Sequence, residues 1–394
     1  MIVLAGGDVV LPDRILTAGS VVVDGGRIVA IETGAADVPG ATTIDATGCY
    51  IVPGFIDVHV HGVEGIDALD GGDAIARIAS RLPRYGVTAF CPTSVACSPR
   101  DLGWMLAQVR HARVAPVAGS ARVLPAHLES NFINPEFRGA QPAACLRAPV
   151  EGPRDGDFSA ADVLEVIGNA RADVGIVTLA PELPGALDLV QRLVADGHIV
   201  SLGHSGASFD EAMAAIDAGA RHATHLFNRM TPMAHRAPGL PGTVLAREDV
   251  AAELICDGYH VHPAMCRVAI RSKGVDRIMA ITDGTAGTGL APGAHARLGG
   301  QSIRVSERAA VLDDGTLAGS VLTMAAAFRT IVTELGLSIA EAAVLCATSP
   351  ARQLGLTGFG VIADGAVADL VVLDRSFSVV RTLVGGAEVF RSAA

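Results

Sequence analysis

The sequence predicts an α/β protein, a (β/α)8 TIM-type barrel with a small β-sandwich domain formed by both chain ends. Three observations support this prediction. Eight apolar, strand-like runs alternate with Ala-rich helical stretches, both chain ends contain only short strand-like runs with tight turns, and no GxGxxG loop follows the first central strand. The alternation favours a closed parallel barrel over an open doubly wound sheet, the main structural alternative.

The two chain ends are predicted to pair into one β domain. Residues 1–53 have short strands and a tight turn beginning at Asp24, and residues 356–394 have the same texture, with turns at Asp364 and Gly385. We therefore expect a small domain made of 1–53 and 356–394. Residues 54–355 are expected to form the barrel, which would then carry any catalytic site at its strand ends.

The central part of the chain is predicted to supply eight barrel strands, separated by helical patterns such as the one after Asp210. The strands are expected at residues 54–62, 86–94, 122–130, 174–182, 198–206, 222–228, 250–258 and 277–285. Active sites of such barrels lie at the carboxyl ends of the strands. The long insertions at 131–160 and 286–318 are expected to contribute to that face.

Composition excludes several classes of protein. A net charge of -11 argues against a nucleic-acid partner, which normally requires a basic surface. No uninterrupted apolar run reaches the roughly 18 residues of a membrane span. The first residues lack the basic segment of a signal peptide, and the seven cysteines are scattered and never form a CxxC pair. We therefore expect a cytoplasmic protein that binds neither nucleic acid nor membrane.

Residues that bind metals fall at the ends of the predicted strands. The set is His59, His61, Glu129, His204, His225 and Asp283. Because residues i and i+2 of a strand point to the same side, His59 and His61 present two imidazoles together, which suits a divalent ion of the zinc or iron type. Alone, an HxH pair is a weak signal, and two ordinary polar barrel residues are the alternative. Further ligand-type residues at other strand ends favour the metal site.

Glu129 closes an otherwise apolar strand, where a buried carboxylate requires either a basic partner or an ion. His204 and His225 would complete three protein ligands with room for water, although each alone is compatible with a hydrogen-bonded core histidine. Asp283 is the candidate general base, and a turn residue before Gly284 is the alternative. This set of residues predicts amide hydrolysis.

The chain resembles the N-acetylglucosamine-6-phosphate deacetylases of the amidohydrolase superfamily along nearly its whole length. The motifs that carry the resemblance, in family order, are PGFIDVHVHG, HLESNFINPEFRGAQ, GHSGASFDEA, ATHLFNRM, HRAPG, DGYHVHP, ITDGTAGTGL, LAGSVLTM, ATSPARQLGL and ADGAVADLVVLD. Each motif is weak by itself, whereas the set is highly specific.

The resemblance implies residue roles. Glu129, His204 and His225 would bind the principal metal, Asp283 would be the catalytic acid and base, and His59 with His61 would hold a second ion in those members that keep this pair. Asn228 with the Arg229 backbone, Arg236 and His260 would contact the sugar phosphate, Arg236 across a dimer interface, and Gln141 would lie near the acetamide. The implied cofactor is one or two zinc or iron ions, and the implied assembly is a homodimer acting on a phosphosugar.

Three positions in two motifs depart from the family pattern. Ser130 and Asn131 follow the metal-ligand glutamate where the family has Gly-Pro, and Ala237 stands where Glu is usual. A Ser and an Asn beside the metal would be able to bind a different epimer or amide. N-acetylgalactosamine 6-phosphate or another N-acyl amine therefore stays open as a substrate beside N-acetyl-D-glucosamine 6-phosphate.

Three other functions were weighed. Cyclic-amide hydrolases with two metals usually bridge them with a carboxylated lysine, but the sole lysine, Lys273, lies outside the predicted strands. Deaminases usually have a histidine where this chain has Glu129. A catalytically silent relative, serving as a binding or structural protein, is disfavoured because Asp283 and all the principal ligands are present.

Overall fold

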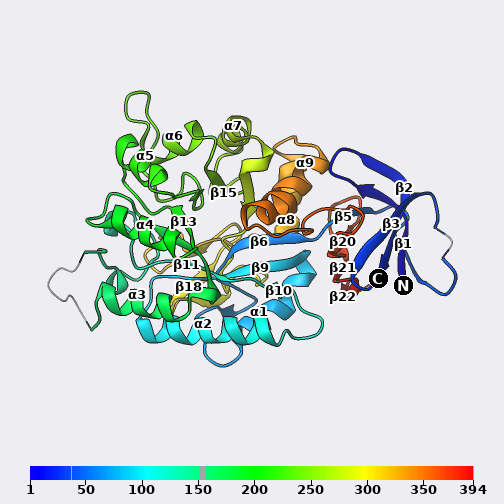
Figure 1. The fold of residues 1–394 in the computed structure, drawn as a ribbon, viewed down its shortest axis with the longest axis horizontal. Coiled ribbons are helices and arrows are strands. Elements are labelled where there is room, and N and C mark those ends of the chain that lie inside the picture. The colour runs from blue at the N-terminus through cyan, green and yellow to red at the C-terminus, as the bar shows by residue number, and fades with distance from the viewer. Residues whose placement is uncertain (37, 151–156, 394) are drawn as a thin grey trace.

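The computed structural model describes residues 1–36, 38–150 and 157–393. Two large sheets carry the architecture. In Figure 1 one of them forms the centre of the left-hand body, where helices surround it, and the other lies at the right, close to both chain termini.

The left-hand body is a parallel barrel. Its strands are β6 (Phe55–Val60), β9 (Val87–Ser94), β10 (Arg122–Val123) with β11 (Ala126–Glu129), β12 (Val174–Leu179), β13 (Ile199–Leu202), β14 (His222–Ala223), β15 (Ala251–Ile255) and β16 (Ile278–Ile281). The last strand returns to the first, because Val60 and Gly284 form a parallel bridge and the His61 amide donates to the Gly284 carbonyl at 2.8 Å. The predicted closed (β/α)8 barrel is confirmed.

All eight barrel strands are shorter than predicted, and two of them also differ in form. The third is divided into β10 and β11 around Pro125, whose ring nitrogen has no proton to donate to a neighbouring strand. The sixth, β14, contains only two residues, and the chain then turns through the positive φ angles of His225 and Phe227. After β14, this turn places His225 at the barrel mouth, two residues beyond the end of the strand.

Helices cover the outside of the barrel (Figure 1). They are α1 (Ala74–Arg81), α2 (Pro99–Val114), α3 (Ala160–Asn169), α4 (Ala186–Ala195), α5 (Phe209–Asp217), α6 (Gly239–Ala246), α7 (Pro263–Lys273), α8 (Met324–Thr333), α9 (Ile339–Ala343) and α10 (Ser349–Gln353). Ser159 and Ser208 form capping boxes at the starts of α3 and α5, which satisfy backbone amides that have no partner within the helix. Among the described residues, no helix is long and apolar enough to cross a membrane.

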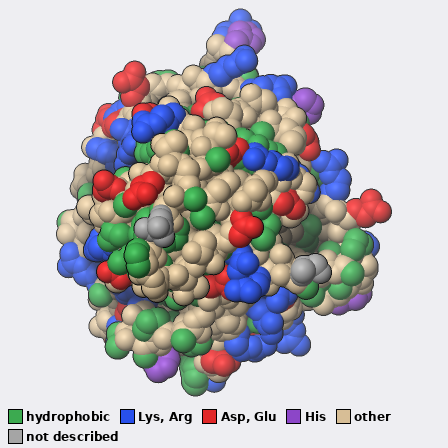
Figure 2. All heavy atoms as spheres, turned by 90° about the vertical axis from the view of Figure 1, so that its right-hand side faces the viewer, with side chains coloured by type: hydrophobic (Ala, Val, Ile, Leu, Met, Phe, Trp, Pro, Cys, Tyr) green, Lys and Arg blue, Asp and Glu red, His purple; other side chains and the backbone are tan. Residues whose placement is uncertain are grey.

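Both chain ends contribute to one eight-stranded sheet. Its order is β22 (Ala387–Arg391), β21 (Val379–Val384), β20 (Leu370–Leu373), β5 (Tyr50–Pro53), β1 (Ile2–Val10), β2 (Ile15–Asp24) and β3 (Arg27–Thr33), with β4 (Thr42–Asp45) beside β1. The antiparallel pair β20–β5 joins the two ends, and Leu4, Ile51 and Leu370 pack in a core separate from that of the barrel. On the face in Figure 2, acidic and basic side chains are interspersed.

The two insertions lie beside the barrel mouth. The second forms a three-stranded sheet of β17 (His295–Leu298), β18 (Gln301–Val305) and β19 (Ala310–Val311), and two short strands, β7 (Gly62–Val63) and β8 (Ile66–Asp67), follow the first barrel strand. The Gln301 side chain donates to the Ala140 carbonyl of the first insertion at 2.6 Å. In the first insertion, residues 151–156 lie outside the described residues.

Candidate metal centre and active site

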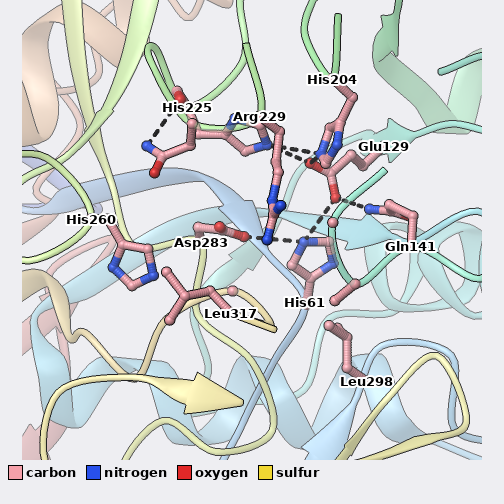
Figure 3. Close-up of a pocket in the computed structure, with 14 residues that line it drawn as sticks. His61, Glu129, Gln141, His204, His225, Arg229, His260, Asp283, Leu298 and Leu317 are labelled. Atoms are coloured by element: carbon pink, nitrogen blue, oxygen red, sulfur yellow. Dashed lines mark hydrogen bonds and ion pairs between the residues drawn. The ribbon is translucent and has the colours of Figure 1, made fainter. Parts of the chain in front are cut away.

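Three candidate ligands from separate strands converge at the barrel mouth (Figure 3). One oxygen of Glu129, Oε1, lies 2.8 Å from Nε2 of His204 and 2.8 Å from Nε2 of His225, and the two imidazole nitrogens are 3.0 Å apart. All three side chains are buried. A carboxylate oxygen and two imidazole nitrogens this close together form a set of ligand atoms that is typical of zinc and iron sites. The residues present therefore fit a divalent ion.

The backbone at these residues is strained. His204, His225 and Asp283 have φ angles of 49°, 31° and 49°, in the left-handed region that residues with a side chain seldom adopt. Such conformations persist where the surrounding structure enforces them, and they concentrate at functional sites. Gly203 illustrates that constraint, because a Cβ at this position would lie 2.8 Å from Cβ of Thr224. The sharp turn after β13 thus requires glycine before His204.

His59 and His61 form a second cluster around the same glutamate. Nε2 of His61 lies 3.4 Å from Oε2 of Glu129 and 3.2 Å from Oδ1 of Asp283. Nε2 of His59 lies 3.1 Å from Nε2 of His61 and 3.4 Å from Oδ1 of Asp283. The two oxygens of Glu129 therefore face different imidazoles, Oε1 toward His204 and His225 and Oε2 toward His61. This arrangement suits a carboxylate shared between two ion positions.

The buried carboxylates hold protons on two of these histidines. Burial alone would lower the pKa of His61, but hydrogen bonds to Asp283 and Glu129 outweigh burial and raise it to about 10. The pKa of His225 is likewise raised to about 9, because its hydrogen bond to Glu129 outweighs burial. Burial lowers the pKa of His59 to about 3, so this imidazole is neutral. His204, with His225 and His61, lowers the pKa of Glu129, and His59 and His61 lower the pKa of Asp283, in both cases against the effect of burial.

These pKa shifts predict that metal binding by the chelator-stripped protein strengthens as the pH rises. A cation must displace the protons of His61 and His225, whose pKa values are about 10 and 9, so protons compete with it throughout the range below pH 9. The apparent Kd for Zn²⁺ is expected to fall by up to about tenfold per pH unit for each proton released. Competition titrations at pH 6, 7 and 8 measure this. A Kd that does not change with pH would contradict the proton assignment.

Gln141 holds Glu129 in place. Its Nε2 donates a short hydrogen bond to Glu129 Oε2, and its Oε1 accepts one from the Ala96 amide at 2.7 Å. Because the amide N–H bond fixes which end of the side chain faces Glu129, the carboxylate has a defined orientation. The resemblance implied a place for Gln141 near the acetamide. Gln141 does line the pocket, and it also contacts a candidate metal ligand directly.

Ser130 and Asn131, which depart from the family pattern, are turned away from the pocket. The Ser130 hydroxyl donates to the Thr178 carbonyl at 2.5 Å, and the Asn131 amide donates to the carbonyls of Cys97 and Cys145 at 2.8 and 2.7 Å. Both side chains are buried, and neither lines the pocket. Their hydrogen bonds stabilise the loop after β11, at the two positions where the family has Gly-Pro. The sequence-based expectation that they contact substrate loses its structural basis.

A pocket that is open to solvent lies next to the two clusters. Asn228, Arg229, His260, Leu298 and Leu317 line it, together with the candidate ligands. The Arg229 side chain, and not only its backbone, extends into this pocket (Figure 3). It passes so close to Gly139 that a Cβ there would meet Nε of Arg229 at 2.6 Å.

His260 and Arg236, the other two residues predicted to contact phosphate, are placed differently. Nδ1 of His260 lies 2.6 Å from Asp257 Oδ2, a contact that raises the pKa of His260 although burial opposes it. Its buried Nε2 has no hydrogen-bond partner among the described residues. Arg236 is exposed and does not line the pocket of its own chain.

Sequence reasoning missed two buried carboxylates. Asp57 lies two residues before His59 and accepts a 2.6 Å hydrogen bond from Thr282, which ties the first barrel strand to the last. Glu253, in β15, lies 2.9 Å from Nδ1 of His59. Burial raises the pKa of each to about 7. A charged residue in the middle of an apolar run, as in AAELI, was the available signal for Glu253.

The fold and this site define the class of protein, a barrel hydrolase with a histidine-carboxylate centre at the strand ends. The chain belongs to the amidohydrolase family, whose model matches residues 50–389. Within it, the chain belongs to the family of the N-acetylglucosamine-6-phosphate deacetylases. It is 34% identical to the Bacillus subtilis enzyme of that name over 98% of this chain and 96% of the relative, and 37% identical to the human one over 89% and 86%.

Solved structures agree with this assignment. The N-acetylglucosamine-6-phosphate deacetylase from Pasteurella multocida superposes with a TM-score of 0.90 at 26% identity, covering 99% of this chain and 100% of that one. A mutant of the Mycobacterium smegmatis enzyme, solved in complex with N-acetyl-D-glucosamine-6-phosphate, gives a TM-score of 0.88 at 32% identity over 98% and 99%. The resemblance found in the sequence is confirmed.

Proposed function

We propose that the protein hydrolyses the acetamide of N-acetyl-D-glucosamine 6-phosphate, releasing acetate and the amino sugar phosphate. The observation that carries this proposal is the convergence of Glu129, His204 and His225 beside Asp283 in a chain whose relatives bear the name of this reaction. The complex of the Mycobacterium smegmatis enzyme with that sugar phosphate further supports the substrate.

The metal would be held by Glu129, His204 and His225, and a second ion by His59 and His61 together with Glu129 and Asp283. A divalent ion at this site would polarise the amide carbonyl and acidify a water molecule. Zinc and iron both suit the nitrogen and oxygen donors. Glu129, fixed by Gln141, would contribute to both ion positions.

Asp283 would transfer the protons. Its pKa is lowered by His59 and His61, so it is ionised at neutral pH and able to accept a proton from the attacking water. The same carboxyl group would then donate that proton to the amine nitrogen as the carbon–nitrogen bond breaks. The walls formed by Leu298 and Leu317 would limit access of bulk water to the scissile amide.

The phosphate would be bound at the outer end of the pocket by Asn228, the Arg229 backbone, the Nε2 atom of His260, and Arg236 of a partner subunit. Because Arg236 is exposed and does not line the pocket of its own chain, the proposal includes a homodimer in which each chain completes the other's phosphate site. The proposal keeps the domain boundaries expected from the sequence, with the small domain at 1–53 and 356–394 and the barrel at 54–355. It also keeps the expected cytoplasmic location.

Replacing Arg236 by Ala is expected to raise KM for the 6-phosphate substrate about 10- to 100-fold, since a charge-assisted hydrogen bond contributes about 1.5–3 kcal/mol. Activity on the same sugar without phosphate is expected to stay within about twofold, because the lost contact is to phosphate alone. Steady-state kinetics on both substrates measure this, with Arg100→Ala as an exposed control. Equal losses on both substrates would exclude Arg236 from the phosphate site.

The function itself is tested by an amine-release assay on a panel of N-acyl hexosamines, each with and without a 6-phosphate. We expect the highest kcat/KM for N-acetyl-D-glucosamine 6-phosphate. A higher value for the galactosamine epimer would overturn the proposed substrate. Absence of turnover on every member, in protein with full metal content, would instead support a catalytically silent relative.

A further inference from the structure

Glu253 is a carboxylate buried inside the barrel, in the middle of β15. Its side chain is 0% exposed, and the only basic side chains near its oxygens among the described residues are the imidazoles of His59 and His127, whose pKa values burial lowers to about 3 and 4. An unpaired carboxylate buried this deeply strongly destabilises the fold unless its oxygens accept hydrogen bonds or bind an ion. Glu253 does not line the active-site pocket, so the candidate mechanism leaves it without a role.

The contacts of Glu253 lead to the metal centre. Oε2 lies 2.9 Å from Nδ1 of His59 and 3.3 Å from the backbone amide of His225, so a single oxygen contacts a residue of each cluster. Oε1 lies 3.6 Å from Nδ1 of His127 and has no hydrogen-bond partner among the described residues.

A separate metal site formed by His59, His127 and Glu253 is not supported, although their ligand atoms lie close together. Both nitrogens of His127 are already occupied, Nδ1 by the Val58 carbonyl at 3.0 Å and Nε2 by the Thr178 hydroxyl at 2.7 Å. His127 therefore has no lone pair directed at an ion. The remaining short contact of Glu253 is the one to His59.

This contact determines the tautomer of His59. When Glu253 is ionised, its oxygens can only accept a hydrogen bond, so Nδ1 of His59 then carries the proton and Nε2 carries the lone pair. Nε2 is the atom that faces Asp283 and Glu129, at 3.4 and 3.8 Å. A carboxylate behind a metal-binding imidazole both orients the ring and makes it a stronger donor.

We propose that Glu253 is the positioning residue that allows the His59 and His61 side of the site to hold a second ion. The inference rests on the proposed metal-dependent function, but it concerns ion number rather than substrate. Glu253 forms no hydrogen bond with the side chains of Glu129, His204 or His225, which would hold the other ion. Its contact with His225 is to the backbone amide alone. Loss of the carboxylate should therefore weaken one ion and leave the other in place.

The test compares ion binding by wild type, Glu253→Gln, Glu253→Leu and His59→Ala. Chelator-stripped protein is titrated with Zn²⁺, and bound metal is counted by elemental analysis. Wild type is expected to bind two ions, and each Glu253 variant to retain the tighter one while the second weakens about 10- to 100-fold. Glu253→Gln keeps the side-chain volume, so it still tests the loss of the carboxylate if Glu253→Leu fails to fold. Asp173→Asn, which removes another buried carboxylate that is paired with Arg110 and Arg113 instead of with a candidate metal ligand, is the matched control.

Double replacement separates positioning from a purely structural role. If Glu253 acts through His59, the variant lacking both is expected to bind the second ion no more weakly than His59→Ala alone. Additive losses, unchanged binding in both Glu253 variants, or a single ion in wild type would each overturn the proposal. Absence of deacetylase turnover in wild type that binds two ions would overturn the proposed function and leave the role of Glu253 standing.

Discussion

Replacement of Asp283 by Asn is expected to lower kcat by roughly 10²- to 10⁴-fold, the usual contribution of a positioned acid-base group. Asn has nearly the same shape but cannot accept a proton from water at neutral pH or return it to the leaving amine. The carboxylate lies 3.2 Å from His61 and 3.4 Å from His59, close to where water would be activated. Steady-state amine release measures the loss.

The control for this experiment is metal content, because Asp283 also lies beside the second ion position. Elemental analysis should show that the ion held by Glu129, His204 and His225 is retained in Asp283→Asn. Asp314→Asn, a change in a turn of the second insertion, should leave kcat unaltered. Turnover in Asp283→Asn within a few-fold of wild type would exclude Asp283 as the general base.

Replacement of Glu129 by Gln is expected to abolish tight metal binding and to lower kcat/KM by on the order of 10³-fold or more. A metal supplies several kcal/mol of charge stabilisation in the transition state, and about 1.4 kcal/mol corresponds to a factor of ten. Glu129 contacts His204 and His225 through Oε1 and His61 through Oε2, so one substitution affects both ion positions.

Metal stoichiometry and amine release, measured on the same preparation, check this second prediction. Glu165→Gln, on the exposed side of α3, provides a control for the change of charge. Adding millimolar Zn²⁺ is not expected to restore full activity, because the amide oxygen is a weaker ligand than a carboxylate. Wild-type stoichiometry in Glu129→Gln would remove Glu129 from the set of ligands.

The barrel was predictable because its signals are local and repeated. Each strand is a short apolar run ending in a polar residue, and eight such runs alternate with helical patterns, which favours a closed parallel barrel. The pairing of both chain ends followed from their shared strand-and-turn texture. The breaks at Pro125 and after His222–Ala223 were not predicted, because strand length depends on pairing with neighbours distant in the sequence.

The candidate metal residues were predictable for a related reason. In a barrel, position along the strand determines which end a side chain reaches, so ligand-type residues at strand ends must share one mouth. Glu253 was missed because it lies in the middle of a strand, three residues before Cys256, where a charged residue gives no indication of the side chain opposite. Its contact with His59 joins the first and seventh barrel strands. A local sequence pattern does not show that two residues so far apart in the chain are in contact.

The class of fold, the family and the candidate metal ligands at the mouth were predictable from the amino-acid sequence, because periodicity, residue type and short motifs act over a few positions. How the residues around the site are used became clear only in the folded barrel. The fold placed Ser130 and Asn131 against backbone carbonyls and away from the pocket, and directed Arg229 into it. Such outcomes depend on which buried polar groups find partners, and hydrogen bonds between segments far apart in the chain are settled only when the whole barrel has closed.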